Sequence, residues 1–353
     1  MVYLDYAATC PMLESVREKM MEASEKFFGN ASALHTPGHL AMNEIEDCRW
    51  LLAEMIGAEP SEIIFTSGSS ESNNTVIRTF EGHKIIASPL EHHSILEAAR
   101  ACRGDKNPAL YSFMWANNET GEFLKMPALK SDAFLHSDLT QVLGKIPINV
   151  RQMGLSYATF SAHKIGGPIG VGALYVKNGV PFKPLIVGGL QEKGRRGGTY
   201  NTVSIIGFKE ALKHIKSGGL FEKYDKNVRK LRDTLAQRIL AEVPGSSLNT
   251  DIRPLKSLPN ILNVSFEAAE GESIQLYLDA EGVIVSTGSA CAAGDTKPSH
   301  VLMAKTGDAE VAHSSIRFSF GVENTMEDVE YVMRVLPPII DRLQKISTVE
   351  RKK

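Results

Sequence analysis

The chain has 353 residues, of which 43% are hydrophobic and 23% charged, and its formal net charge is −2. This length predicts a main domain with a second, smaller one, and the composition is typical of a soluble globular protein. A net charge of −2 does not favour binding to nucleic acid or to an anionic membrane. No apolar run reaches the roughly 18 residues of a membrane span.

Short apolar runs rich in β-branched residues alternate with helical patterns in the first two thirds of the chain. Helices are predicted at 12–28 and 41–57, the second ending at Gly57, and a further helix over 89–102 with Pro89 at its first position. Strands are predicted at 62–67, 84–88, 109–116, 133–138, 157–162 and 171–176. This alternation indicates an α/β sheet that is mostly parallel, with helices on both faces.

The pattern changes after residue 205. An amphipathic helix is predicted over 221–242, followed by strand-like runs at 260–266 and 282–291 and by helices at 298–305 and 327–346. We therefore expect a large domain over 12–219 and a smaller α+β domain formed by 1–11 and 220–353.

The cysteines indicate the compartment and a candidate nucleophile. Cys10, Cys48, Cys102 and Cys291 form no CxxC pattern, which argues against a zinc site or a disulfide framework and favours a reducing cytoplasm. The N-terminus also lacks the basic region of a secretory signal. Cys291 differs from the other three because "GSAC" (288–291) predicts an accessible loop, where a thiol can react.

Two polar clusters follow predicted strands, at the sheet edge where open α/β sheets bind ligands. In "TSGSSESNN" (66–74), serine hydroxyls and the backbone N–H groups of a helix start can hold an anion, although an ordinary serine cap has the same pattern. His92 in "LEHHSIL" (90–96) can stack on an aromatic ligand, or simply begin a helix.

Four further residues complete a possible site. In "HSDLTQ" (136–141), Asp138 can pair with a ring cation and Gln141 can donate to a phenolate oxygen, while Lys164 in "SAHKIGGPIG" (161–170) can become a neutral amine in a tight glycine-rich turn. Arg317 in "SSIRFSFG" (314–321) can hold a carboxylate by two hydrogen bonds or form a salt bridge between the domains. Together these groups describe pyridoxal 5′-phosphate acting on an amino acid.

The motifs, taken in order, resemble the cysteine desulfurases of the class V aminotransferase group, which use pyridoxal phosphate. The resemblance runs nearly end to end and rests on "YLDYAAT", "GNASALH", "EIIFTSGSSESNN", "NNETG", "DLTQVLGK", "SAHKIGGPIGVGALYV", "RRGGT", "GSAC" and "SIRFSFG". It implies the fold type I of pyridoxal-phosphate-dependent transferases, with a mostly parallel seven-stranded sheet in the large domain.

The resemblance also implies how the cofactor would be held. Lys164 would carry it as a Schiff base, His92 would stack on its ring, Asp138 would pair with the ring nitrogen, and Gln141 would bond to the phenolic oxygen. Its phosphate would be bound by Ser69, Ser70, Ser161 and His163. Thr199 would reach the phosphate of the neighbouring subunit, which requires a homodimer.

The remaining implied roles concern the substrate. Asn118 would contact both cofactor and substrate, and Arg317 would hold the carboxylate of L-cysteine. Lys164, assisted by His92, would move the α-proton. Cys291 would attack the substrate sulfur, leave as a persulfide and release alanine. The persulfide would pass to an iron–sulfur scaffold or a tRNA-thiolation protein, and Cys291 could briefly ligate a cluster shared with the scaffold.

The chain departs from the family pattern at a few places. The stretches from His92 to Asn118 and from there to Asp138 are shorter than in family members, which puts the dimer and partner surfaces in question. Ser70 replaces the usual Thr. Two alternatives stay open: a selenocysteine lyase or another class V aminotransferase or lyase, and a non-catalytic sulfur-relay or scaffold-binding protein.

Overall fold

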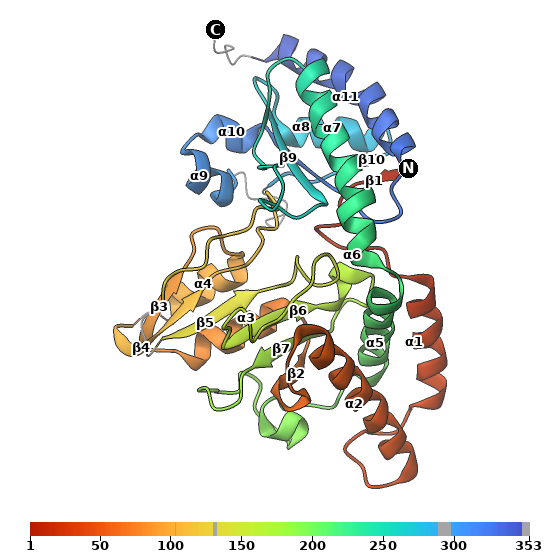
Figure 1. The fold of residues 1–353 in the computed structure, drawn as a ribbon, viewed down its shortest axis with the longest axis vertical. Coiled ribbons are helices and arrows are strands. Elements are labelled where there is room, and N and C mark those ends of the chain that lie inside the picture. The colour runs from red at the N-terminus through yellow and green to blue at the C-terminus, as the bar shows by residue number, and fades with distance from the viewer. Residues whose placement is uncertain (103, 130–132, 289–297, 348–353) are drawn as a thin grey trace. The chain divides into compact units, whose positions relative to one another are not determined.

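The computed structural model describes residues 1–102, 104–129, 133–288 and 298–347, and the chain forms two compact units (Figure 1). Unit 1 comprises Met1–Thr9, Ala116–Phe123 and Phe221–Lys353, and unit 2 comprises Cys10–Trp115 and Leu124–Leu220. The short segment Ala116–Phe123 belongs to unit 1, although it lies inside the range expected for the large domain. Among the described residues, no helix has both the length and the hydrophobicity needed to cross a bilayer.

Unit 2 is built on a six-stranded sheet with the order β2-β7-β6-β5-β4-β3. Its strands are β2 (Ile63–Thr66), β3 (His83–Ala87), β4 (Lys106–Ser112), β5 (Phe134–Asp138), β6 (Tyr157–Ser161) and β7 (Gly172–Val176). Strands β3 to β6 run parallel, whereas β7 is antiparallel to both of its neighbours. All six strands expected from the runs are confirmed, and the mostly parallel α/β class with them.

The expectation of seven strands is wrong for the residues that the structure describes. Between His92 and Asn118 the chain has room for one helix and one strand, α4 (His93–Ala101) and β4. The β3 and β4 strands are therefore joined by a single short crossover and lie side by side in the sheet. The shortened stretch thus removes an element that the resemblance implied.

The helices of unit 2 start and end where capping groups allow. They are α1 (Glu14–Lys26), α2 (Thr36–Ile56), α3 (Ser69–Thr79), α4 and α5 (Thr202–Ser217), with 3-10 turns η1 (Pro60–Glu62), η2 (Ala162–Ile165) and η3 (Gln191–Gly194). Gly57 ends α2 with φ 71°, as expected. The expected helix start at Pro89 is wrong, because the His92 ring accepts a hydrogen bond from Ser94 N and makes His92 the N-cap.

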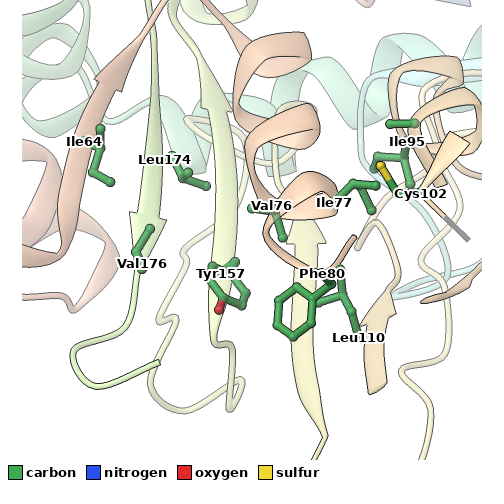
Figure 2. Packing of buried hydrophobic residues seen from close by; sticks show 11 residues of the cluster. Ile64, Val76, Ile77, Phe80, Ile95, Cys102, Leu110, Tyr157, Leu174 and Val176 are labelled. Carbon is green, nitrogen blue, oxygen red and sulfur yellow. The ribbon is translucent and has the colours of Figure 1, made fainter. Parts of the chain in front are cut away.

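A hydrophobic core fills one face of the sheet, between its strands and α3 and α4 (Figure 2). Ile64, Tyr157 and Leu174 come from three adjacent strands and Val76 from α3, and each has at most 1% of its surface exposed. Cys102 is buried in this cluster and Cys48 in α2, so both cysteines pack as small apolar side chains.

Unit 1 holds two small sheets and the C-terminal helices. Antiparallel strands β8 (Ser246–Leu248), β9 (Ile261–Phe266) and β11 (Ser315–Ser319) have the order β11-β9-β8, and β1 (Val2–Tyr3) pairs in parallel with β10 (Val283–Ile284). The helix expected at 221–242 is confirmed and includes a π-helical turn. The helices are α6 (Leu220–Lys223), η4 (Tyr224–Val228), α7 (Arg229–Glu242), α8 (Gly271–Ala280), α9 (His300–Thr306), α10 (Ala309–His313) and α11 (Met326–Ile346).

A fully buried histidine lies in the middle of the unit 2 sheet. His136 on β5 bonds through Nδ1 to Ser112 Oγ at 2.9 Å and through Nε2 to Thr159 Oγ1 at 3.1 Å. Both partners are uncharged hydroxyls on the neighbouring strands. Burial therefore lowers the pKa of His136, although the negative charge of Asp138 acts in the opposite direction.

The buried His136 should make the protein sensitive to acid. Below a pH of about 6.5 the unfolded chain binds a proton at this residue that the native state rejects, so stability is lost as the pH falls. His136→Gln should reduce the slope of unfolding free energy against pH by up to about 1.4 kcal/mol per unit between pH 6.5 and 4.5, measured by urea denaturation. The exposed His39→Gln serves as control, and equal slopes for all three proteins would refute this assignment.

Candidate active site

The loops that carry the candidate residues of unit 2 meet at one edge of its sheet. Gly172, at the start of β7, pairs with both Thr66 at the end of β2 and Ser161 at the end of β6. Asp138, at the end of β5, pairs with Thr159 of β6. Strands β2, β5 and β6 therefore end together, and this is the edge at which open α/β sheets bind ligands.

The first turn of α3 lies at this edge, in an arrangement that can hold an anion. Gly68 precedes the helix with φ 149°, and a Cβ built on Gly172 would lie 2.7 Å from Gly68 Cα, so that only glycine allows this close approach. Ser69 Oγ lies 2.6 Å from Thr140 Oγ1, and a Cβ at Gly68 would be 3.8 Å from Ser161 Oγ. Two of the expected phosphate-binding serines thus flank a helix N-terminus.

The other expected phosphate ligands also lie in unit 2. Ser70 is exposed in the first turn of α3, and Thr199 is exposed three residues beyond Arg196. Arg196 forms a two-bonded ion pair with Glu71, at 3.0 and 3.2 Å, which neutralises the carboxylate nearest the start of α3. Arg196 therefore favours an anion at this helix end, a contribution that the sequence analysis did not assign.

A chain of hydrogen bonds connects Asp138 to His92. Asn73 Nδ2 donates to Asp138 Oδ2 at 2.8 Å and to Ser94 Oγ at 2.9 Å, and Ser94 Oγ lies 2.9 Å from His92 Nδ1. The second oxygen of Asp138 accepts from Thr140 N at 2.9 Å. Because His92 Nδ1 also accepts from Ser94 N, the neutral ring carries its proton on Nε2. Asn73 thereby fixes both groups expected to face the cofactor ring.

Asn73→Ala should weaken retention of the cofactor. The substitution removes one charge-assisted bond to Asp138, worth about 1.5 kcal/mol, so the dissociation constant of pyridoxal phosphate should rise about tenfold. Equilibrium dialysis with the purified variant measures this constant. Asn74→Ala is the matched control, because Asn74 Nδ2 bonds to the carbonyl oxygens of Ser70 and Ser94 rather than to Asp138. Equal constants for the two variants would show that Asn73 has no special role.

Lys164 lies in η2, the tight turn between β6 and β7. Its carbonyl oxygen accepts from Cys10 Sγ at 3.0 Å and is 3.5 Å from Lys145 Nζ, and Cys10 N donates to the His163 carbonyl at 2.9 Å. Gly166 ends the turn with φ 76°, and a Cβ there would lie 2.7 Å from Leu13 Cγ. The backbone around Lys164 is thus held from several sides, while its side chain stays only partly buried.

The electrostatics of this turn favour uncharged nitrogen bases. Burial and the nearby Lys164 and Lys145 lower the pKa of His163 to about 4, so the ring is neutral near pH 7. Burial also lowers the pKa of Lys145. Two amines and one imidazole therefore share a region where additional positive charge is unfavourable.

The donor set of unit 2 fits pyridoxal phosphate. A carboxylate fixed by two donors suits a protonated ring nitrogen, and an oriented imidazole suits the ring face. The start of α3 suits the phosphate and Lys164 supplies the amine. Gln141 is buried three residues after Asp138, where the sequence analysis expects it. Asp138 ends β5, α3 begins after β2, and Lys164 follows β6, so these groups lie at one sheet edge.

Arg317 and Asn118 belong to unit 1. Arg317 is buried on β11 and donates to Asp5 Oδ1 at 2.8 Å and to the Asn118 carbonyl at 3.0 Å. Its Nε has no hydrogen-bond partner among the described residues. Because Asp5 also belongs to unit 1, this salt bridge is not the one between domains that the sequence analysis left open, and Arg317 keeps N–H groups for a further carboxylate. Cys291 lies outside the described residues.

The sequence analysis missed Asn73, Ser94 and Thr140 as supporting residues. Asn73 is one helical turn beyond Ser69 and Ser70, so its position on the same face of α3 was a usable signal. Ser94 and Thr140 each lie two residues after an assigned side chain, His92 and Asp138, where short turns bring polar groups back to that side chain.

The comparisons with known proteins agree along nearly the whole chain. The family model "Aminotransferase class-V" matches residues 2–107 and 104–332, and its two parts meet inside the shortened stretch after His92. "Cysteine desulfurase IscS" of Dictyoglomus turgidum is 40% identical, with 98% of this chain and 96% of that protein covered. A solved "NifS-like protein" is 33% identical with a TM-score of 0.85, over 98% of this chain and all of that one. "SspA in complex with cysteine" is 31% identical with a TM-score of 0.77, over 92% of this chain and all of that one.

Proposed function

Because the chain belongs to the class V aminotransferase family, as a cysteine desulfurase of the IscS type, we infer that it takes sulfur from L-cysteine and releases L-alanine. The observation that carries this proposal is the sheet edge of unit 2. There Lys164 would supply the amine for pyridoxal phosphate, the fixed Asp138 carboxylate and the oriented His92 ring would contact its ring, and the start of α3 would bind its phosphate. A related structure that binds cysteine supports L-cysteine as the substrate.

Each residue of unit 2 has a defined task in this proposal. Pyridoxal phosphate, when bound, draws electrons away from the α-carbon of an attached amino acid. Asp138 would keep the ring nitrogen protonated, and His92 would cover the ring face and assist proton transfer. Gln141 would bond the phenolic oxygen, while Ser69, Ser70, Ser161 and His163 would bind the phosphate. Lys164 would hold the group through Nζ and, as a free amine, would accept the α-proton of the substrate.

The residues of unit 1 would bind the substrate and take its sulfur. Arg317 would use its remaining N–H groups for the substrate carboxylate, with Asn118 beside it. The Cys291 thiolate would form a sulfur–sulfur bond with the substrate sulfur as the carbon–sulfur bond breaks. A proton then completes the methyl group of alanine, and the sulfur remains on Cys291 as a persulfide.

We further propose a cytoplasmic homodimer in which Thr199 completes the phosphate site of the neighbouring subunit. The persulfide would be passed to an iron–sulfur scaffold or another acceptor protein such as a tRNA-thiolation protein, and Cys291 could briefly ligate a cluster on that scaffold. An assay that follows labelled sulfur from Cys291 to candidate acceptors identifies the partner.

Reduction of the holoprotein with borohydride tests the cofactor assignment. The proposal predicts a pyridoxyl group on the peptide that contains Lys164, found by mass spectrometry. A label on another lysine, or protein that pyridoxal phosphate cannot reconstitute, would contradict it and would favour a non-catalytic sulfur-relay protein.

A further inference from the structure

Gly288 and Ser299, which lie on either side of segment 289–297, pack against each other. A Cβ built on Gly288 would be 2.9 Å from Ser299 Cβ and 3.2 Å from Ser299 Oγ. Such contacts are shorter than ordinary van der Waals separation, so the glycine backbone itself packs on Ser299. The segment that contains Cys291 therefore begins and ends at nearly the same place in unit 1.

Glu119 contacts both of these flanking residues through one oxygen. Its Oε2 accepts a hydrogen bond from Ser299 Oγ at 2.5 Å, and a Cβ on Gly288 would lie 2.6 Å from the same oxygen. A side chain at position 288 would therefore displace the Glu119 carboxylate. This contact gives the glycine of "GSAC" a steric reason in addition to its flexibility.

Glu119 is itself held rigidly in unit 1. Only 3% of its surface is exposed. Its backbone N donates to Asn117 Oδ1 at 2.8 Å, and its carbonyl oxygen accepts from Asn263 Nδ2 on β9 at 3.3 Å. Buried polar networks whose hydrogen bonds are satisfied are rigid, so a carboxylate fixed in this way holds its hydrogen-bond partners in place.

Each flanking region is also tied to a regular element. Ser286 exchanges two backbone hydrogen bonds with Arg317 on β11, at 2.7 and 3.2 Å. Ser299 caps α9 by accepting from Leu302 N at 3.1 Å. Glu119 thus connects Gly288, which follows the residue paired with β11, to Ser299 at the start of α9.

We propose that Glu119 is a positioning residue that holds together the two ends of the segment carrying Cys291, and so limits where its thiol can reach. The inference rests on the proposed sulfur-accepting role of Cys291. Separating the ends would let the thiol sample a larger volume, and orientation lost at a reacting group lowers the rate of the chemical step.

The ionisation of Glu119 offers a signature that a purely structural residue would lack. Burial raises the pKa of Glu119 to about 7, while the Ser299 hydrogen bond and the positive charge of Arg317 oppose the shift. Arg317, paired with Asp5, is the charged group that acts on it. The ionised carboxylate, which predominates above pH 7, accepts the hydrogen bond from Ser299 more strongly than the neutral acid does. The contact between Glu119 and Ser299 should therefore become stronger as the pH rises.

The experiment measures persulfide formation on Cys291 in single turnovers of the holoenzyme with L-cysteine, by alkylation and mass spectrometry. Glu119→Ala should slow this step by about tenfold or more, with the concentration of L-cysteine that gives half the maximal rate little changed. Glu119→Gln keeps an acceptor oxygen and should restore most of the rate above pH 7. In the wild type, the rate of persulfide formation should change with pH near 7 because both Glu119 and the Cys291 thiol ionise. In Glu119→Gln, only the change due to the thiol should remain.

A second serine–glutamate pair in unit 1 provides matched controls. Ser273 Oγ donates to Glu270 Oε2 at 2.9 Å at the exposed start of α8. Glu270→Ala and Ser273→Ala should leave the rate unchanged, whereas Ser299→Ala should slow it in the same direction as Glu119→Ala. If Glu119→Ala does not fold, Ser299→Ala still decides the matter. A wild-type rate in either variant would overturn the proposal.

Alkylation of Cys291 without substrate separates this inference from the proposed function. Iodoacetamide reactivity and hydrogen exchange at 285–288 and 299–303 should rise in Glu119→Ala whatever the reaction is. If Cys291→Ala still desulfurates cysteine, the proposed function fails. If Cys291→Ala is inactive and Glu119→Ala has the wild-type rate, only the positioning role fails.

Discussion

Lys164→Ala is expected to reduce the turnover of L-cysteine by about four orders of magnitude, because the variant lacks both the amine that holds the cofactor and the base for the α-proton. The fold should be preserved. The contacts that fix η2 run to the carbonyl oxygens of His163 and Lys164, which alanine retains. Steady-state alanine production and thermal unfolding measure the two effects.

Lys177→Ala is the control for Lys164→Ala, because Lys177 follows β7 directly and is exposed. It should match the wild type in both measurements. The Lys164 variant should still bind pyridoxal phosphate without a covalent bond, since Asp138, His92 and the start of α3 are unchanged. Turnover above a hundredth of the wild-type rate would show that another lysine supplies the amine.

Cys291→Ser is expected to abolish persulfide formation and to lower alanine release from L-cysteine by about a thousandfold or more, since a hydroxyl is far less ionised than a thiol near pH 7. Binding of L-cysteine should remain, because Arg317, Asn118 and Lys164 are untouched. Alanine release and the spectrum of the cofactor on addition of substrate measure the two properties separately.

Cys48→Ala is the matched control for Cys291→Ser. Cys48 is completely buried in α2, and burial raises its pKa, so it remains an unreactive thiol. Its variant should keep wild-type activity. Full alanine release by Cys291→Ser would contradict the account, and retention of selenium release from selenocysteine alone would favour a selenocysteine lyase.

The sequence predicts the framework of the site well because its signals are local. Alternation of buried strands and helices locates all six strands of the unit 2 sheet, and glycine with φ 71° ends α2 where the sequence places it. The motif around Lys164 identifies a tight turn for the same reason. Small residues are needed there, since a Cβ at Gly166 would collide with Leu13.

The parts that the sequence does not predict depend on contacts between distant residues. The start of α4 at His93 follows from the His92 ring, which no helix pattern reveals. The contact of Asn73 with Asp138 joins residues 65 positions apart, and that of Glu119 with Ser299 joins residues 180 positions apart. Neither pair has a periodic signal. The seventh strand was expected from the resemblance alone, and the short stretch after His92 leaves no place for it.

The central claim is that sulfur moves from L-cysteine to Cys291 as alanine forms. The most direct test is one turnover of the holoenzyme with sulfur-labelled L-cysteine, with alanine and the labelled peptide quantified together. The account predicts equal amounts of alanine and of labelled persulfide on Cys291. Pyruvate in place of alanine, or label on Cys10, Cys48 or Cys102, would contradict it.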